Sequence, residues 1–241
     1  MTADAGGDVV DPFNQDVLAG GGYRYTTEAS LSSRLANARM TQASLRAAPW
    51  HGARAIDIGC GDGTYTAEIL SLGHPASVSG IDPAPAAVAA ARERHPDARL
   101  SFNVGSAYDL PHGDAEFDLG YLRGVLHHVD RPTEALREAV RVARAVVVVE
   151  PNGYNPGLKL LERVSSYHRE HGERSHPASR LDRWAGEAGG RVVWRAFVGF
   201  VPMFSPDPYA RAAKVMEPLL ERLPGVRRAT CAQYVFTVAR D

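Results

Sequence analysis

The stretch that decides the fold is AIDIGCGDGT, residues 55–64 of the 241-residue chain. It begins as a short apolar run, passes into three glycines at every second position, and leads into a segment with helical periodicity. Glycines at the end of a strand permit a sharp turn, and the N-terminus of a following helix presents partial positive charge there. The stretch therefore predicts a strand, a turn and a helix, with a ligand site where the strand ends.

On both sides of this stretch, strand-like and helical segments alternate. A helix is predicted over 30–48, because it starts at a favourable N-cap serine and ends before Pro49. Five strands are expected at 53–58, 76–81, 100–104, 117–122 and 145–150, with helices at 64–72, 83–95 and 133–143. Such alternation predicts an α/β fold, a doubly wound and mostly parallel sheet with helices on both faces.

After Glu150 the regular alternation of strand-like and helical segments ends. Helical stretches are expected at 157–171, 179–188 and near 209–223, and strands at 191–201 and 229–239. We expect one domain over 1–241, built from an N-terminal helical lid (1–50), a ligand-binding half (51–150), an inserted cap (151–190) and C-terminal strands with a helix (191–241).

Composition narrows the function classes. The chain has 27 Lys and Arg against 28 Asp and Glu, so it lacks the excess of positive charge that binds nucleic acid or anionic lipid. No apolar run approaches the roughly 20 residues of a membrane span and no leader is visible, so a cytoplasmic location is expected. Two distant cysteines provide neither a disulfide framework nor a structural zinc site.

Carboxylates surround the glycine turn. Asp57 and Asp62 lie within it, and Asp82 ends the second predicted strand, where a carboxylate can accept hydrogen bonds from ribose hydroxyls. Thr64 stands where a dinucleotide fingerprint has its third glycine, and three carboxylates would repel a pyrophosphate. The pattern favours a cationic, adenosine-containing ligand, the alternative being glycines that only make a tight turn.

These residues resemble class I S-adenosylmethionine-dependent methyltransferases. The similar segments, in the family's order, are 57–63 (DIGCGDG), 80–82 (GID), 105–111 (GSAYDLP) with 117–119 (FDL), and 125–129 (VLHHV). The resemblance implies a Rossmann-like, seven-stranded sheet with its last strand antiparallel. It also implies S-adenosyl-L-methionine as cofactor and S-adenosyl-L-homocysteine as product.

The resemblance further implies a set of cofactor-binding residues. Ser106 stands where the family commonly has Asp, but its hydroxyl can still hydrogen-bond the adenine amino group, and Tyr108 can add stacking. The implied residues are Tyr25, Asp57, Gly59, Cys60, Gly61, Thr64, Asp82, Pro83, Ser106, Ala107, Tyr108, Leu122 and Arg123.

Candidate catalytic residues are His127 and His128, which follow the fourth predicted strand. If the acceptor is a hydroxyl, a general base of near-neutral pKa assists, and histidine is the usual one. Adjacent helical residues point about 100° apart, so only one ring would face the pocket. The resemblance favours His127 as the base or the group that orients the acceptor. The alternative is that both histidines are only packing or capping residues.

The segment 167–176 concentrates three histidines, His168, His171 and His176. These histidines could form a solvated face, contact the acceptor or bind a metal. The segment has neither the H-E-x-x-H order nor its inverse, so no metal is expected.

The function that these features predict is methyl transfer to a small-molecule acceptor, foremost O-methylation of a hydroxylated secondary metabolite. The alternatives are N- or C-methylation, other chemistry in a methyltransferase fold, and a non-catalytic partner that binds S-adenosylmethionine. A nicotinamide-dependent oxidoreductase is disfavoured by Thr64. No nucleic-acid or membrane partner is expected, and a monomer and a homodimer both remain open.

Overall fold

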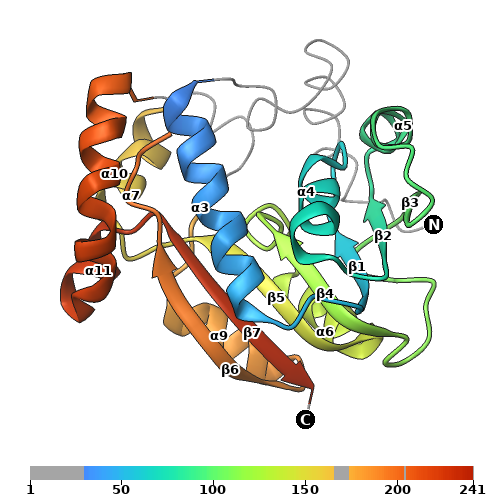
Figure 1. Ribbon diagram of the computed structural model, residues 1–241. Helices are drawn as coiled ribbons and strands as arrows, with labels where there is room; N and C mark the ends of the chain where they lie inside the picture. Colours follow the sequence, from blue (N-terminus) through green and yellow to red (C-terminus); the bar gives the residue numbers. More distant parts are fainter. Residues whose placement is uncertain (1–29, 166–173, 204, 241) are drawn as a thin grey trace.

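The computed structural model describes residues 30–165, 174–203 and 205–240. Its centre is a seven-stranded sheet with the order β3-β2-β1-β4-β5-β7-β6 (Figure 1). The strands are β1 (Arg54–Ile58), β2 (Ser77–Asp82), β3 (Leu100–Val104), β4 (Phe117–Arg123), β5 (Ala143–Pro151), β6 (Gly190–Val198) and β7 (Gln233–Arg240).

Strand directions confirm the expected doubly wound sheet. β1 pairs in parallel with β2 on one side and β4 on the other, so the strand order reverses at β1. β7 runs antiparallel to both β5 and β6. In sheets of this kind the ligand crevice lies at the carboxyl ends of the parallel strands beside the reversal.

Helices cover both faces of the sheet. α3 and α4 share an apolar core with one face, and α6 and α9 share a second core with the other, while α5 packs on β2 and β3. The helices are α3 (Leu31–Ala47), α4 (Thr64–Gly73), α5 (Pro85–Arg94), α6 (Pro132–Val142), α7 (Pro156–Val164), α9 (Ala178–Glu187), α10 (Asp207–Arg222) and α11 (Pro224–Thr230).

Local sequence explains two of the predicted elements, α3 and β5. α3 begins after Ser30, whose hydroxyl accepts a hydrogen bond from the backbone N–H of Ser33 at 3.3 Å, as an N-cap serine should. In β5 the four valines 146–149 are all buried, because this central strand is covered by helices on both faces.

The expected strand over 229–239 is wrong at its start. Residues 224–230 form α11, and β7 begins only at Gln233. Pro224 lies at the beginning of α11, a position where proline's fixed φ and missing N–H suit a helix.

Among the residues that the structure describes, none of the helices combines the length and the apolar character needed to cross a bilayer.

Candidate active site

The glycine turn after β1 lies beside the end of β2. Gly59, Gly61 and Gly63 have φ values of +79°, +54° and +76°, in the left-handed region that favours glycine. The backbone N–H groups of Gly59 and Cys60 donate to the carbonyl of Ile81 at 2.7 and 3.1 Å. A Cβ on Gly59 would lie 2.5 Å from a methyl carbon of Val125, so the turn also fits closely against the segment after β4.

Asp82 joins the turn to the end of β2. Its Oδ2 accepts the N–H of Gly61 at 2.8 Å, and its Oδ1 accepts the N–H of Ala84 at 2.9 Å. Each oxygen retains a further lone pair. Burial raises the pKa of Asp82, and the charge of Asp62 adds to that rise. The two elements on which the predicted nucleoside site depends are therefore directly hydrogen-bonded.

Two more carboxylates complete the acidic cluster. Asp57 is buried and accepts a hydrogen bond from the hydroxyl of Thr66 at 2.6 Å. Burial raises its pKa to about 7. Asp62, also buried, accepts the N–H of Thr64 at 3.2 Å and contacts Arg94 at 3.2 Å. Three buried carboxylates at one strand edge suit a cationic ligand such as a sulfonium, which would offset their mutual repulsion.

The raised pKa of Asp57 gives a prediction on stability. The folded-state pKa of about 7 exceeds the ordinary value of 3.8, so the folded protein holds a proton that the unfolded chain releases. The contribution of Asp57 to the free energy of unfolding is therefore fully present below about pH 4 and is lost as the pH rises through 7. The asparagine of Asp57→Asn cannot ionise. Between pH 5 and pH 8, we therefore expect the free energy of unfolding of the wild type to fall by a few kcal/mol more than that of the variant.

Urea denaturation at both pH values measures this difference. Asp118→Asn is the control, because Asp118 is 45% exposed. Equal pH dependence in wild type and Asp57→Asn would show that Asp57 ionises normally in the folded protein.

The segment after β3 lies next to Asp82, since Gly105 donates its N–H to the Asp82 carbonyl at 3.0 Å. The Ser106 side chain is exposed at this edge, and its oxygen accepts the N–H of Tyr108 at 3.2 Å, which leaves its hydroxyl hydrogen available. The Arg131 guanidinium lies 4.3 Å from the centroid of the half-buried Tyr108 ring. Ala107 packs against the same core as Tyr108.

Other predicted cofactor residues are placed less directly. The side chains of Cys60 and Leu122 are buried in apolar clusters, so contact with a ligand there would involve their backbone. Pro83 is exposed beside Asp82. Thr64 begins α4 and is partly buried. Tyr25 lies outside the described residues.

Arg123, at the end of β4, connects two helices. Its guanidinium lies 3.5 Å from the centroid of the Tyr65 ring on α4. It also donates to Thr41 Oγ1 at 2.9 Å and to Asn37 Oδ1 at 3.0 Å, both on α3. These contacts hold α3 and α4 against the carboxyl end of β4.

The expectation that His127 and His128 begin a helix is wrong. They lie in a turn, and α6 starts only at Pro132. Gly124, with φ of +71°, reverses the chain directly after β4. The two imidazole rings therefore lie against each other, with centroids 3.9 Å apart, instead of diverging by the helical angle.

Glu150 at the end of β5 organises this turn, and it is not among the site residues predicted from the sequence. It is 1% exposed, and its Oε1 accepts the N–H groups of Val125 and Leu126 at 2.9 and 2.7 Å. Its Oε2 lies 2.8 Å from Nδ1 of His127. The available signal was an acidic residue directly after the apolar run 145–149, in the place that Asp82 has at the end of β2.

One histidine of the predicted cap also reaches this region. His176 pairs with Asn152, two residues after Glu150, in an isolated parallel bridge, and its carbonyl accepts the N–H of Gly153 at 3.1 Å. Burial lowers the pKa of its imidazole. His168 and His171 lie outside the described residues. Within the described part of the chain, His, Cys, Asp and Glu side chains form no group of three that could hold a metal ion.

The sheet order and the acidic turn beside its reversal define the class I Rossmann-like methyltransferase fold. The chain is 20% identical to a methyltransferase from Thermotoga maritima described as a possible histamine N-methyltransferase, with a TM-score of 0.70 over 97% of this chain and all of that one. Residues 56–148 match the methyltransferase domain family. This segment is a class I S-adenosylmethionine-dependent methyltransferase domain.

Two curated relatives each match less than half of the chain. An O-methyltransferase of Penicillium expansum is 33% identical over 108 residues, which are 43% of this chain and 38% of that protein. A ubiquinone biosynthesis O-methyltransferase of Azorhizobium caulinodans is 33% identical over 121 residues, 49% of this chain and 45% of its own. The chain thus spans less than half the length of these two relatives.

Proposed function

We propose that this protein transfers a methyl group from S-adenosylmethionine to a hydroxyl of a small molecule. The observation that carries the proposal is the hydrogen-bonded pair of His127 and Glu150, 2.8 Å apart, next to the turn that holds the acidic cluster. The O-methyltransferases among the relatives support oxygen as the attacking atom.

The residues around the glycine turn would hold the cofactor. Asp82 retains lone pairs for the ribose hydroxyls, and Ser106 retains a hydroxyl hydrogen for the adenine. The left-handed turn at Gly59 and Gly61 would let the backbone approach the cofactor closely. When bound, S-adenosylmethionine supplies a methyl group already activated by its sulfonium charge, so positioning provides most of the acceleration.

His127 would manage the single proton of the reaction. In the tautomer whose Nδ1 donates to Glu150, the neutral imidazole carries its lone pair on Nε2, the atom that would act as the base. During methyl transfer the Nε2 atom of His127 would take the hydroxyl proton of the acceptor. The buried Glu150 carboxylate then pairs with the imidazolium. Release of that proton to solvent restores the base.

The acceptor is expected to be small and without a large negative charge. The net charge of the chain is −1, and the crevice edge carries the buried acidic groups Asp57, Asp62 and Asp82. Polyanionic acceptors such as nucleic acids would be repelled there. A hydroxylated, moderately apolar metabolite fits both conditions.

The direct test is a screen of hydroxylated, amine and carbon-acid metabolites with the purified protein and S-adenosylmethionine. We expect formation of S-adenosylhomocysteine together with a gain of one methyl mass on a hydroxylated compound. Methylation restricted to amines would contradict the assignment to oxygen. Binding of S-adenosylmethionine no tighter than millimolar, measured by calorimetry, would contradict the proposal as a whole.

A further inference from the structure

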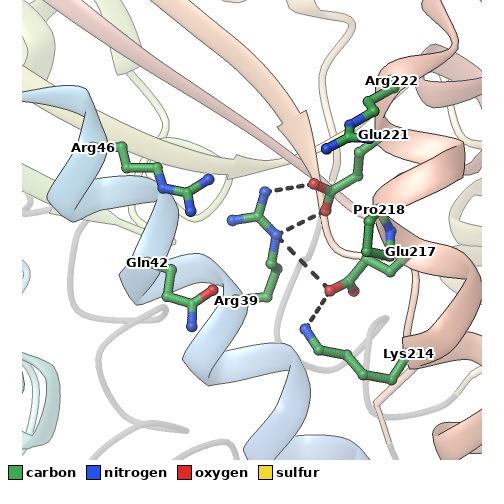
Figure 2. A pocket seen from close by; sticks show the side chains of 8 residues that line it. All are labelled: Arg39, Gln42, Arg46, Lys214, Glu217, Pro218, Glu221 and Arg222. Atoms are coloured by element: carbon green, nitrogen blue, oxygen red, sulfur yellow. Dashed lines mark hydrogen bonds and ion pairs between the residues drawn. The ribbon is translucent and has the colours of Figure 1, made fainter.

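A second site lies between α3 and α10, away from the acidic turn. A pocket of about 390 Å³ opens there, lined by Arg39, Gln42, Arg46, Lys214, Glu217, Pro218, Glu221 and Arg222 (Figure 2). Four of these side chains are basic and two are acidic, so the lining carries an excess of positive charge. A chain with net charge −1 has therefore concentrated cations at one place.

Both carboxylates of the pocket are fully engaged. Glu221 accepts from Nε of Arg39 at 2.9 Å, from Nη2 of Arg39 at 2.5 Å, and from the N–H of Gly199 at 2.9 Å. Glu217 accepts from Lys214 and from the N–H of Phe200 at 3.0 Å. The two acidic groups are thus neutralised by one arginine and one lysine, with backbone donors in addition.

Positive charge remains after this pairing. Within residues 30–165, 174–203 and 205–240, neither Arg46 nor Arg222 has a hydrogen bond or an ion pair in the structure. Nη1 of Arg39 is buried and has no hydrogen-bond partner. Figure 2 shows this third guanidinium nitrogen turned away from the two carboxylates and toward the guanidinium of Arg46.

We propose that this pocket binds a phosphate dianion, either inorganic phosphate or the phosphate group of a small metabolite. Arginine donors are planar and suit a tetrahedral oxyanion, and hydrogen bonds of this charged kind are among the strongest in proteins. An oxyanion between Arg39 and Arg46 would give Nη1 its missing acceptor after a small movement of the Arg39 side chain that opens this buried nitrogen to the pocket. Arg222, on the facing helix, would supply further positive charge.

Helix termini explain only part of the arrangement. Arg46 and Arg222 lie in the last turns of α3 and α10, where a cation also offsets the helix dipole. That role needs no pocket and leaves Nη1 of Arg39, in the middle of α3, without an acceptor. A bound anion accounts for the dipole-facing arginines and the buried donor together.

Calorimetric titration with inorganic phosphate, at constant ionic strength set with chloride, tests the site. We expect the wild type to bind phosphate, and Arg46→Gln and Arg222→Gln each to weaken binding at least about fivefold. The matched control is Arg211→Gln, an exposed arginine of α10 that does not line the pocket. Thermal unfolding in chloride alone checks that each variant is folded.

The proposal would be overturned if Arg211→Gln weakened phosphate binding as much as the pocket variants do. It would also be overturned if Arg46→Gln bound phosphate as the wild type does, or if the wild type showed no saturable binding. A soluble phosphate monoester and vesicles containing phosphatidic acid form two further arms. Binding of the monoester, lost in the pocket variants, supports a small metabolite as the source of the phosphate group. Binding of the vesicles without binding of the monoester would overturn the assignment to a small molecule.

Discussion

Replacing His127 with asparagine is expected to lower turnover by about 100-fold or more, with the affinity for S-adenosylmethionine unchanged. The asparagine amide can still donate to Glu150 from near the position of Nδ1, but it has no basic nitrogen in place of Nε2. Steady-state kinetics with the acceptor found in the screen, together with calorimetry for the cofactor, separates the two effects. Unaltered turnover would reduce His127 to a packing residue.

Glu150→Gln is the companion variant. Its amide oxygen can still accept the N–H groups of Val125 and Leu126, while its amide nitrogen donates to Nδ1 and forces the proton onto Nε2. We expect lower turnover and an altered pH profile in a protein of normal fold.

The pair of His112 and Glu116 provides matched controls, because Nδ1 of His112 lies 3.1 Å from Oε1 of Glu116 in a different loop. His112→Asn and Glu116→Gln make the same two chemical changes away from the crevice. They are expected to leave turnover as in the wild type.

Replacing Asp82 with asparagine is expected to weaken S-adenosylmethionine binding by roughly 1–3 kcal/mol, the usual loss for a hydrogen bond to a charged group. The variant retains one oxygen as an acceptor but loses the carboxylate that would receive the ribose hydroxyls and offset the sulfonium charge. Calorimetric titration measures the change for the cofactor and for S-adenosylhomocysteine.

Asp97→Asn is the control for this variant. The Asp97 side chain is 37% exposed, and it also accepts a backbone N–H, from Arg99 at 2.9 Å. Its replacement should leave cofactor affinity unaltered. If Asp82→Asn bound S-adenosylmethionine as tightly as the wild type, the ribose would have to lie elsewhere.

Much of the fold could be predicted because the signals were local. β3 begins and ends at the predicted residues, and β1, β2 and β4 lie within a residue or so of theirs, since each is a short apolar or alternating run bounded by turn residues. The start of α3 at Ser30 followed from its cap. The contact between the glycine turn and Asp82 followed from the parallel order of β1 and β2, whose carboxyl ends share one edge.

The organisation of the histidine turn could not be predicted, because it depends on contacts distant in sequence. Glu150 lies 23 to 25 positions from the backbone groups and the ring that it binds, and only the pairing of β4 with β5 brings them together. The α3–α10 pocket has the same origin, since Arg39 and Glu221 are 182 positions apart. No local periodicity or motif in the sequence indicates such pairs.

The bidentate contact between Arg39 and Glu221 has an evolutionary consequence. Their side chains are only 11% and 13% exposed, so loss of either partner leaves the other as a largely buried, uncompensated ion, which is strongly destabilising. Natural lineages should therefore exchange both residues or neither, and the two positions are expected to covary across the family tree even where the acceptor differs.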